Sequence, residues 1–235
     1  MSYIVAEQMG KSFGSGAAAV HAVRDLNFRI APGEFVAIMG ESGAGKSTLL
    51  AMLGAMNAPT TGRLQVDGID VYALNPDQLA DFRREYLGFV FQSFHLVPYL
   101  SVLENVMLPL AVGRLRNREK RRLAEEALAQ VGLAGKAARL PGEISGGEKE
   151  RVAVARAIVN EPPVLLADEP TGNLDSGNSR EIMRMFQRLN DSGMTVIMVT
   201  HSAECAGHAG RILQLSDGRL TLDRQTADSA LRRAS

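Results

Sequence analysis

A chain of 235 residues is long enough for one large α/β domain with a sizeable buried core. With 46% hydrophobic and 22% charged residues, it is too apolar for a disordered protein. Its 26 basic residues balance its 26 acidic ones, which argues against a nucleic-acid partner because no net positive charge would attract one. Cys205 is the one cysteine, so an intrachain disulfide is excluded and a reducing compartment is indicated.

The N-terminal residues 1–5 lack the basic stretch and apolar core of a signal peptide. Apolar runs such as residues 35–39 and 164–167 are far too short to cross a bilayer. We therefore expect a chain that is soluble by itself and acts at a membrane only through a partner.

The first half of the chain predicts strands followed by a loop and a helix. Residues 26–30 alternate in polarity, a turn follows at residues 31–34, and residues 35–39 are all apolar, as in a strand covered on both faces. Residues 40–45 are rich in glycine, and residues 47–56 have a helical pattern. The local order is therefore strand, loop, helix.

The middle of the chain, from about residue 101 to residue 160, is predicted to be mostly helical. Ser101 can cap a helix over residues 102–112, and residues 118–131 carry one apolar face. This pattern indicates a helical lobe inserted into an α/β core.

The last third returns to alternating strands and helices. Residues 163–167 and 195–199 are predicted strands, separated by a helix over residues 178–189, which favours a parallel sheet. Residues 212–222, broken at Asp217 and Gly218, predict a hairpin, and the polar tail 226–235 is expected to fray.

Residues 40–47 match the phosphate-loop pattern G-x-x-x-x-G-K-[ST], between a predicted strand and a predicted helix. Lys46 is expected to reach the β- and γ-phosphates of ATP, and Ser47 to bind Mg²⁺. The alternative is a glycine-rich turn that binds nothing. The predicted nucleotide contacts are Gly40, Glu41, Ser42, Gly43, Ala44, Gly45, Lys46, Ser47 and Thr48.

Asp168 and Glu169 follow the apolar run 164–167, where a metal-linked acid belongs in this class of NTPase. Asp168 is predicted to hold Mg²⁺, and Glu169 to orient or deprotonate the attacking water. Two acids after a strand can also be a solvated loop, and the phosphate loop favours the functional interpretation. One phosphate loop and no internal repeat indicate a single nucleotide domain over residues 1–235.

Further motifs make the chain resemble the ATP-binding proteins of ABC transporters along nearly its whole length. Residues 144–151, Ile-Ser-Gly-Gly-Glu-Lys-Glu-Arg, are similar to the ABC signature motif. Residues 172–175, Gly-Asn-Leu-Asp, resemble the D-loop. The resemblance implies a P-loop NTPase core with a mostly parallel sheet (residues 1–92 and 161–235), an N-terminal antiparallel β region and an inserted helical subdomain (residues 93–160).

The resemblance also implies roles for individual residues. Phe13 would stack on adenine, Gln92 would be the Q-loop glutamine and a further metal ligand, and His201 the switch histidine. With Lys46 and Glu169, Gln92 and His201 would form the catalytic set, while Ser47, Gln92 and Asp168 would hold the metal. The remaining implied nucleotide contacts are Ser145, Gly146, Gly147, Glu148 and Asp175.

Each of these motifs has a purely structural alternative. A lone Gln92 or His201 can be a surface or capping residue, Phe13 a packing residue, and Ser145 with Glu148 an ordinary helix cap. The chain also departs from the usual family pattern. Glu148 and Glu150 replace glutamines, Ile144 replaces leucine and Phe13 replaces tyrosine.

In this family, one subunit's signature helix completes the ATP site of the other, so the implied partner is a second copy of the chain, arranged head to tail. A transmembrane permease would dock against the helical lobe. Residues 87–98 resemble the lipoprotein-release and macrolide-export branch, which implies export or extraction of a lipoprotein, lipid, peptide or drug-like cargo. The predicted docking residues are Phe94, Leu96, Val97, Tyr99 and Leu100.

The implied location is the cytoplasmic face of the inner membrane, held peripherally through the permease, with a periplasmic accessory protein as a further partner. Three alternatives belong to other classes. They are an ABC importer ATPase, a soluble ABC protein of DNA repair or translation, and a regulator of cell-wall hydrolysis acting through a membrane partner.

Overall fold

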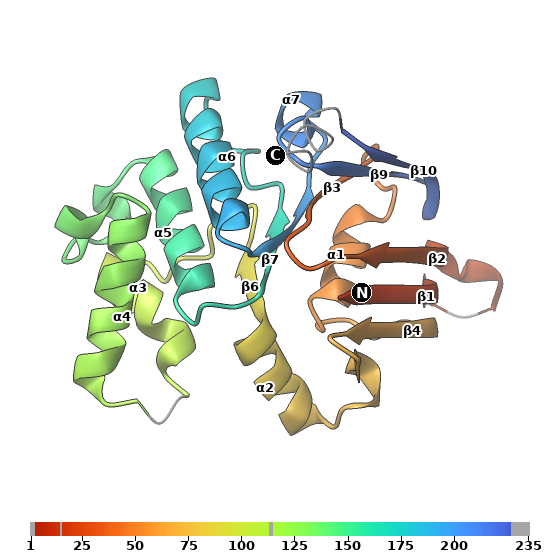
Figure 1. Cartoon of the computed structure of the whole chain (residues 1–235), viewed down its shortest axis with the longest axis horizontal. Coiled ribbons are helices and arrows are strands. Elements are labelled where there is room, and N and C mark those ends of the chain that lie inside the picture. The colour runs from red at the N-terminus through yellow and green to blue at the C-terminus, as the bar shows by residue number, and fades with distance from the viewer. Residues whose placement is uncertain (1–2, 15, 113–114, 227–235) are drawn as a thin grey trace.

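A computed structural model describes residues 3–14, 16–112 and 115–226, and it shows an α/β fold built on two β-sheets (Figure 1). The strands are β1 (Ile4–Phe13), β2 (Val20–Ile30), β3 (Phe35–Met39), β4 (Thr61–Val66), β5 (Ile69–Asp70), β6 (Leu87–Val90), β7 (Val164–Asp168), β8 (Thr195–Val199), β9 (Arg211–Ser216) and β10 (Arg219–Gln225). The α-helices are α1 (Lys46–Leu53), α2 (Pro76–Tyr86), α3 (Val102–Met107), α4 (Asn117–Gln130), α5 (Gly146–Ile158), α6 (Ser176–Asp191) and α7 (Ala203–Ala206).

The larger sheet has six strands in the order β10-β9-β3-β8-β7-β6. Strands β9, β3, β8, β7 and β6 pair in parallel, and only β10 is antiparallel, joined to β9 by a two-residue turn. Asp217 and Gly218 in this turn have φ values of 49° and 75°, the left-handed conformation that a tight hairpin requires. The predicted mostly parallel sheet and the predicted hairpin are both confirmed.

The smaller sheet is antiparallel, with the strand order β2-β1-β4-β5. Ile4 on β1 lies opposite Ile30 on β2 and Val66 on β4, and all three side chains are buried. This sheet is the antiparallel N-terminal region that the family resemblance implied.

The parallel sheet separates two hydrophobic cores. On β3, Phe35 and Ala37 face one core while Val36 and Ile38 face the other, and β7 and β8 alternate in the same way. Helices α5 and α6 pack against the first face, and α3 and α4 extend that core sideways by packing against α5, whereas α1 and the antiparallel sheet cover the second face (Figure 1). Burial on both faces explains why these strands are apolar at nearly every position, Thr195 and Asp168 at strand ends excepted.

Two predicted helices end earlier than their patterns indicated. The helix predicted over residues 102–112 stops at Met107 and continues as a short 3₁₀ turn, Leu108–Leu110, because Pro109 has no N–H to donate. Helix α1 stops at Leu53, and Gly54 follows as its cap. The predicted fraying tail lies outside the described residues except for Thr226. Within the described ranges, no helix is long and apolar enough to span a bilayer.

Candidate functional site

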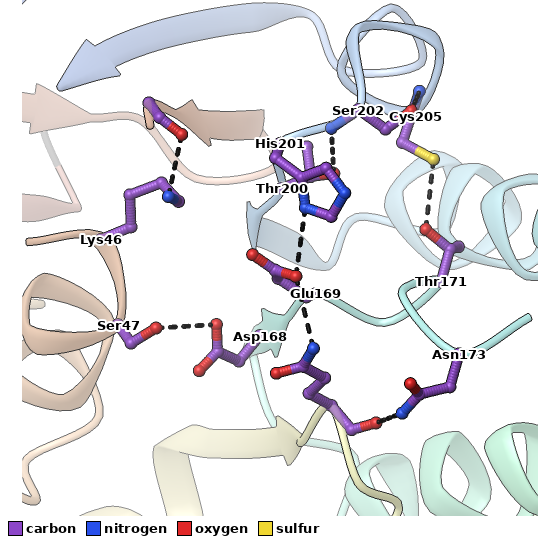
Figure 2. Close-up of polar contacts among 12 residues, drawn as sticks. Lys46, Ser47, Asp168, Glu169, Thr171, Asn173, Thr200, His201, Ser202 and Cys205 are labelled. Atoms are coloured by element: carbon purple, nitrogen blue, oxygen red, sulfur yellow. Dashed lines mark hydrogen bonds and ion pairs between the residues drawn. The ribbon is translucent and has the colours of Figure 1, made fainter. Parts of the chain in front are cut away.

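The predicted catalytic and metal-binding residues gather where four parallel strands end. The phosphate loop follows β3, Gln92 follows β6, Asp168 and Glu169 close β7, and His201 follows β8. Because carboxyl ends of parallel strands meet at one edge of a sheet, these distant segments come together there. Figure 2 shows their polar side chains around a common centre.

The loop between β3 and α1 needs glycine at two positions where its backbone packs directly against the backbone of β2 or β9. Gly45 has φ 95°, and a Cβ there would lie 2.1 Å from the carbonyl oxygen of Ala22 on β2. Gly40 packs against the carbonyl of Leu215, which a Cβ would approach to 2.4 Å. The loop can therefore hold its shape only with glycine at these two positions.

Lys46 is buried, with 6% of its surface exposed, although it carries a charge. Its ammonium donates hydrogen bonds to the carbonyl oxygens of Gly40, at 2.9 Å, and Glu41, at 2.7 Å. The side chain thus bends back over its own loop, and its charge lies where the loop and the start of α1 would meet an anion.

Ser47 and Asp168 form the next pair, with the hydroxyl donating to the carboxylate over 3.3 Å. Burial raises the pKa of Asp168, and the charge of Glu169 adds to the shift, while the hydrogen bond from Ser47 opposes it. A divalent cation at this point would relieve the crowding of negative charge. Mg²⁺ prefers oxygen ligands and takes one or two from protein, so Ser47 and Asp168 fit such an ion.

Glu169 lies between Gln92 and His201. Its Oε2 atom accepts from Gln92 Nε2 at 3.4 Å and lies 3.2 Å from His201 Nδ1 (Figure 2). The backbone of Glu169 is left-handed, with φ 45°, and its N–H donates to the carbonyl of Val199. A strained backbone that aims a carboxylate at the centre of a site is typical of functional positions.

Phe13 stands at the end of β1, with 45% of its surface exposed. The ammonium of Lys11 lies 5.3 Å from the centroid of its ring. Phe13 pairs with Val20 on β2, the strand that also touches the phosphate loop through Ala22. An exposed ring therefore lies on the sheet that borders the loop, and its stacking role remains a prediction.

Ser145 caps helix α5 and is exposed. Its hydroxyl accepts from the N–H of Glu148 at 3.2 Å, while the Glu148 carboxylate accepts from the N–H of Ser145 at 2.9 Å. This backbone hydrogen bond, together with Lys136 at 3.4 Å, lowers the pKa of Glu148. The structural alternative, a capping box, is therefore real. It satisfies the N–H of Glu148, and among the described residues the N–H groups of the exposed Gly146 and the buried Gly147 have no hydrogen-bond partner.

The neighbourhood of the signature motif is close-packed but separate from the phosphate loop. A Cβ on Gly147 would lie 2.0 Å from Asn178 Oδ1 on α6, whereas Gly146 is exposed. Asp175 caps α6 by accepting from the N–H groups of Gly177 and Asn178. Among the described residues, no hydrogen bond or ion pair joins residues 145–148 to residues 40–48. The chain by itself therefore does not bring the two motifs together.

Three polar side chains hold the segment after β6, and the sequence analysis assigned none of them this role, although one of them belongs to the D-loop motif. Asn173 donates to the carbonyl of Gln92 at 2.8 Å. Arg156 donates to the carbonyls of Phe94 and His95, both at 2.6 Å. The buried Asn105 accepts from the N–H of Val97 and donates to three carbonyls nearby. In the sequence, Asn105 and Arg156 each stand out as a polar residue within an apolar helical run, and this pattern could have indicated a structural role for them.

Beside this segment lies a mainly apolar groove of about 420 Å³, which we call the lateral groove. It runs between α2, β6 and the turn after α3, and its walls include Met56, Phe89, Phe91, Leu108, Val112 and Arg156. Met56 and Val112 are 48% and 80% exposed. None of the five residues predicted for docking lines it, and their role in docking stays a prediction.

Comparison with known proteins gives a consistent result. The family model for ABC transporters matches residues 23–172. An uncharacterized ABC transporter ATP-binding protein, YvrO from Bacillus subtilis, is 44% identical over 215 residues, which cover 92% of this chain and 94% of YvrO. The macrolide export ATP-binding/permease protein MacB from Sodalis glossinidius is 44% identical over 95% of this chain. The chain spans about a third (34%) of the length of that MacB protein.

A solved structure is also similar. The ATP-binding cassette MJ0796, in a dimeric post-hydrolysis state bound to ADP and Pi, superposes with a TM-score of 0.87 at 40% identity. The match covers 94% of this chain and 98% of that one.

Proposed function

Because the chain belongs to the ABC transporter family, we propose that it is the ATP-hydrolysing subunit of a transporter and works as a head-to-tail dimer around ATP. One observation carries the proposal. Lys46, Ser47, Asp168 and Glu169 converge on one point, while Ser145 lies in a separate part of the chain. A site that lacks its signature motif within one chain is completed by a second copy.

The chain's own residues divide the reaction between them. Lys46 stabilises negative charge on the β- and γ-phosphates, and the glycine-rich loop binds them through its N–H groups. Ser47, Asp168 and Gln92 would hold Mg²⁺, which neutralises charge on the phosphates when bound. Glu169 orients a water molecule and accepts its proton, and Gln92 and His201 keep that carboxylate in position.

The partner subunit supplies Ser145, Gly146 and Gly147. The exposed N-terminus of α5 presents free N–H groups and the positive end of the helix dipole to a γ-phosphate. Hydrolysis converts ATP and water into ADP and inorganic phosphate, and release of that phosphate removes the charge that holds the two copies together, so the dimer reopens. Phe13 stacks on the adenine, keeping a π face although tyrosine is more usual there.

The occupant that we propose for the lateral groove is a short cytoplasmic segment of a transmembrane permease. The groove is mainly apolar, and exposed apolar surface of this kind is typical of an interaction site. The likeness to MacB, a macrolide export ATP-binding/permease protein almost three times as long, supports a permease partner. We place the subunit at the cytoplasmic face of the inner membrane, with lipoprotein, lipid, peptide or drug-like cargo moved outward.

Replacing Glu169 by Gln tests the hydrolytic role. We expect unchanged ATP affinity, turnover reduced at least about a hundredfold, and an ATP-dependent dimer in size-exclusion chromatography with light scattering. Glu126→Gln is the matched control, because it changes an exposed carboxylate of α4 whose one partner among the described residues is Arg122. Normal hydrolysis by the Glu169→Gln variant would overturn the assignment.

Co-purification from membranes tests the transport role. An exporter branch predicts a four-helix permease with a large extracytoplasmic domain, and an accessory protein beyond the membrane would fit with it. Recovery of a many-helix importer with a solute-binding protein would contradict that branch and leave the ATPase role intact.

A further inference from the structure

The turn that follows Gln92 has an unusual backbone. Phe94 and His95 are consecutive non-glycine residues in the left-handed region, with φ values of 58° and 48°. Such a conformation costs free energy of order 1–3 kcal/mol per residue and persists only where the surroundings impose it. Something must therefore hold this turn in place.

Arg156 is the group that holds it. Its Nη1 atom donates to the carbonyl of His95 and its Nη2 atom to the carbonyl of Phe94, both at 2.6 Å. The planar guanidinium thus grips two successive carbonyls with two donors, a geometry that a lysine ammonium does not reproduce. Helix α5 carries Arg156 two residues before its last residue, Ile158, and begins after the Ser145 cap, so one rigid element links the turn to the signature motif.

The surroundings of Arg156 favour these carbonyls as its partners. The side chain is half-buried, and the carboxyl group that acts on it electrostatically is that of Glu150, also on α5. Glu150 is 1% exposed, and its Oε1 has no hydrogen-bond partner among the described residues. Burial raises the pKa of Glu150 to about 8, so near pH 7 the carboxyl is mostly neutral and Arg156 lacks a full counter-charge.

Hydrogen bonds also hold Gln92, which lies just before this turn. Asn173 donates to the carbonyl of Gln92, and the Gln92 side chain reaches Glu169. Arg156 also lines the lateral groove together with Phe91. The Arg156 side chain therefore lines the lateral groove and fixes the turn that follows Gln92. It belongs to α5, the helix that Ser145 caps.

We propose that Arg156 is a positioning residue of the hydrolytic site, which fixes Gln92 against Glu169 by gripping the Phe94–His95 turn and makes that turn move with α5. The inference rests on the proposed ATPase function. It assigns Arg156 no contact with ATP, because its hydrogen bonds end on backbone carbonyls. A displacement of about 1 Å in a catalytic group can lower a rate about a hundredfold, so a loosened turn has a measurable effect.

The test compares Arg156→Gln, Gln92→Ala and the double variant in the full chain. We expect Arg156→Gln to lower kcat at least about tenfold, with the Kd for ATP within about twofold of wild type. If both residues act through one element, the double variant loses no more than the worse single variant. Arg122→Gln, which removes an exposed guanidinium of α4, is the matched control and should leave kcat unchanged.

A structural readout accompanies the kinetics. Hydrogen–deuterium exchange of residues 93–97 should accelerate in Arg156→Gln and not in Arg122→Gln. Should Arg156→Gln fail to fold, Arg156→Lys keeps the positive charge but lacks the two parallel donors of a guanidinium. It should show a kcat and a hydrogen–deuterium exchange rate between those of wild type and those expected for Arg156→Gln. Wild-type kcat and exchange in these variants would overturn the proposal, as would losses that multiply in the double variant. If Glu169→Gln still abolishes turnover in that case, the proposed ATPase function stands and only this inference fails.

Discussion

The substitution Glu150→Gln replaces a buried carboxyl group of α5 by an amide. It therefore measures how much free energy of unfolding the protein loses by burying an acid there. Glu150 is 1% exposed, and burial raises its pKa to about 8 from an ordinary 4.5, against the opposing effect of Arg156. Between these two pH values the folded protein holds a proton that the unfolded chain releases. Stability therefore falls as the pH rises from about 4.5 to about 8, and the loss is complete above that range.

The magnitude follows from the two pKa values. At 1.36 kcal/mol per pKa unit, the raised pKa of Glu150 lowers the free energy of unfolding, relative to its value below pH 4.5, by about 3 kcal/mol at pH 7 and by about 5 kcal/mol above pH 8. Glu150→Gln removes this dependence because an amide does not titrate. The free energy of unfolding of the variant, relative to wild type, should therefore rise by about 4 kcal/mol between pH 5 and pH 8.5.

Urea unfolding followed by circular dichroism at pH 5, 6, 7, 8 and 8.5 measures the difference. Glu126→Gln serves as the control, because its exposed ion pair with Arg122 contributes little at any pH. Parallel pH profiles for wild type and Glu150→Gln, differing by less than about 1 kcal/mol across the range, would refute the reasoning.

Two further substitutions address the signature helix and the segment after β6. Ser145→Arg should abolish ATP hydrolysis and leave ATP binding to the monomer intact, measured by calorimetry, and lost binding would show that Ser145 acts within its own chain. Asn105→Ala leaves buried backbone groups around Val97 unpaired, so it should cost about 3 kcal/mol and lower Tm by about 6–12 °C. An unchanged Tm in calorimetric scans would contradict that role for Asn105.

The order of strands and helices could be predicted because burial leaves a direct pattern in the sequence. Residues 35–39 are apolar throughout and residues 196–199 follow the same pattern after Thr195, and each run is a strand covered on both faces. The spatial order of those strands could not be predicted in this way, since it depends on pairing between distant segments. Helix ends were less certain, and Pro109 ended α3 five residues before the apolar pattern did.

The polar centre of the site was predictable for a related reason. Lys46, Asp168 and His201 each follow an apolar strand, and parallel strands place their carboxyl ends together. Arg156 and Asn173 were not predicted, because their partners are backbone carbonyls whose positions depend on tertiary structure. Nothing in the local sequence around residue 156 shows that two carbonyls lie within its reach.

The central claim, a nucleotide site shared by two copies, is tested most directly by mixing two inactive variants. In a mixed dimer, the Ser145→Arg subunit provides an intact Lys46 and Glu169, and the Glu169→Gln subunit provides an intact Ser145 opposite them. We expect ATPase activity, absent from either variant alone, to return on mixing, up to about a quarter of the wild-type value for random pairing. A mixture that stays inactive at concentrations where mixed dimers form would contradict it.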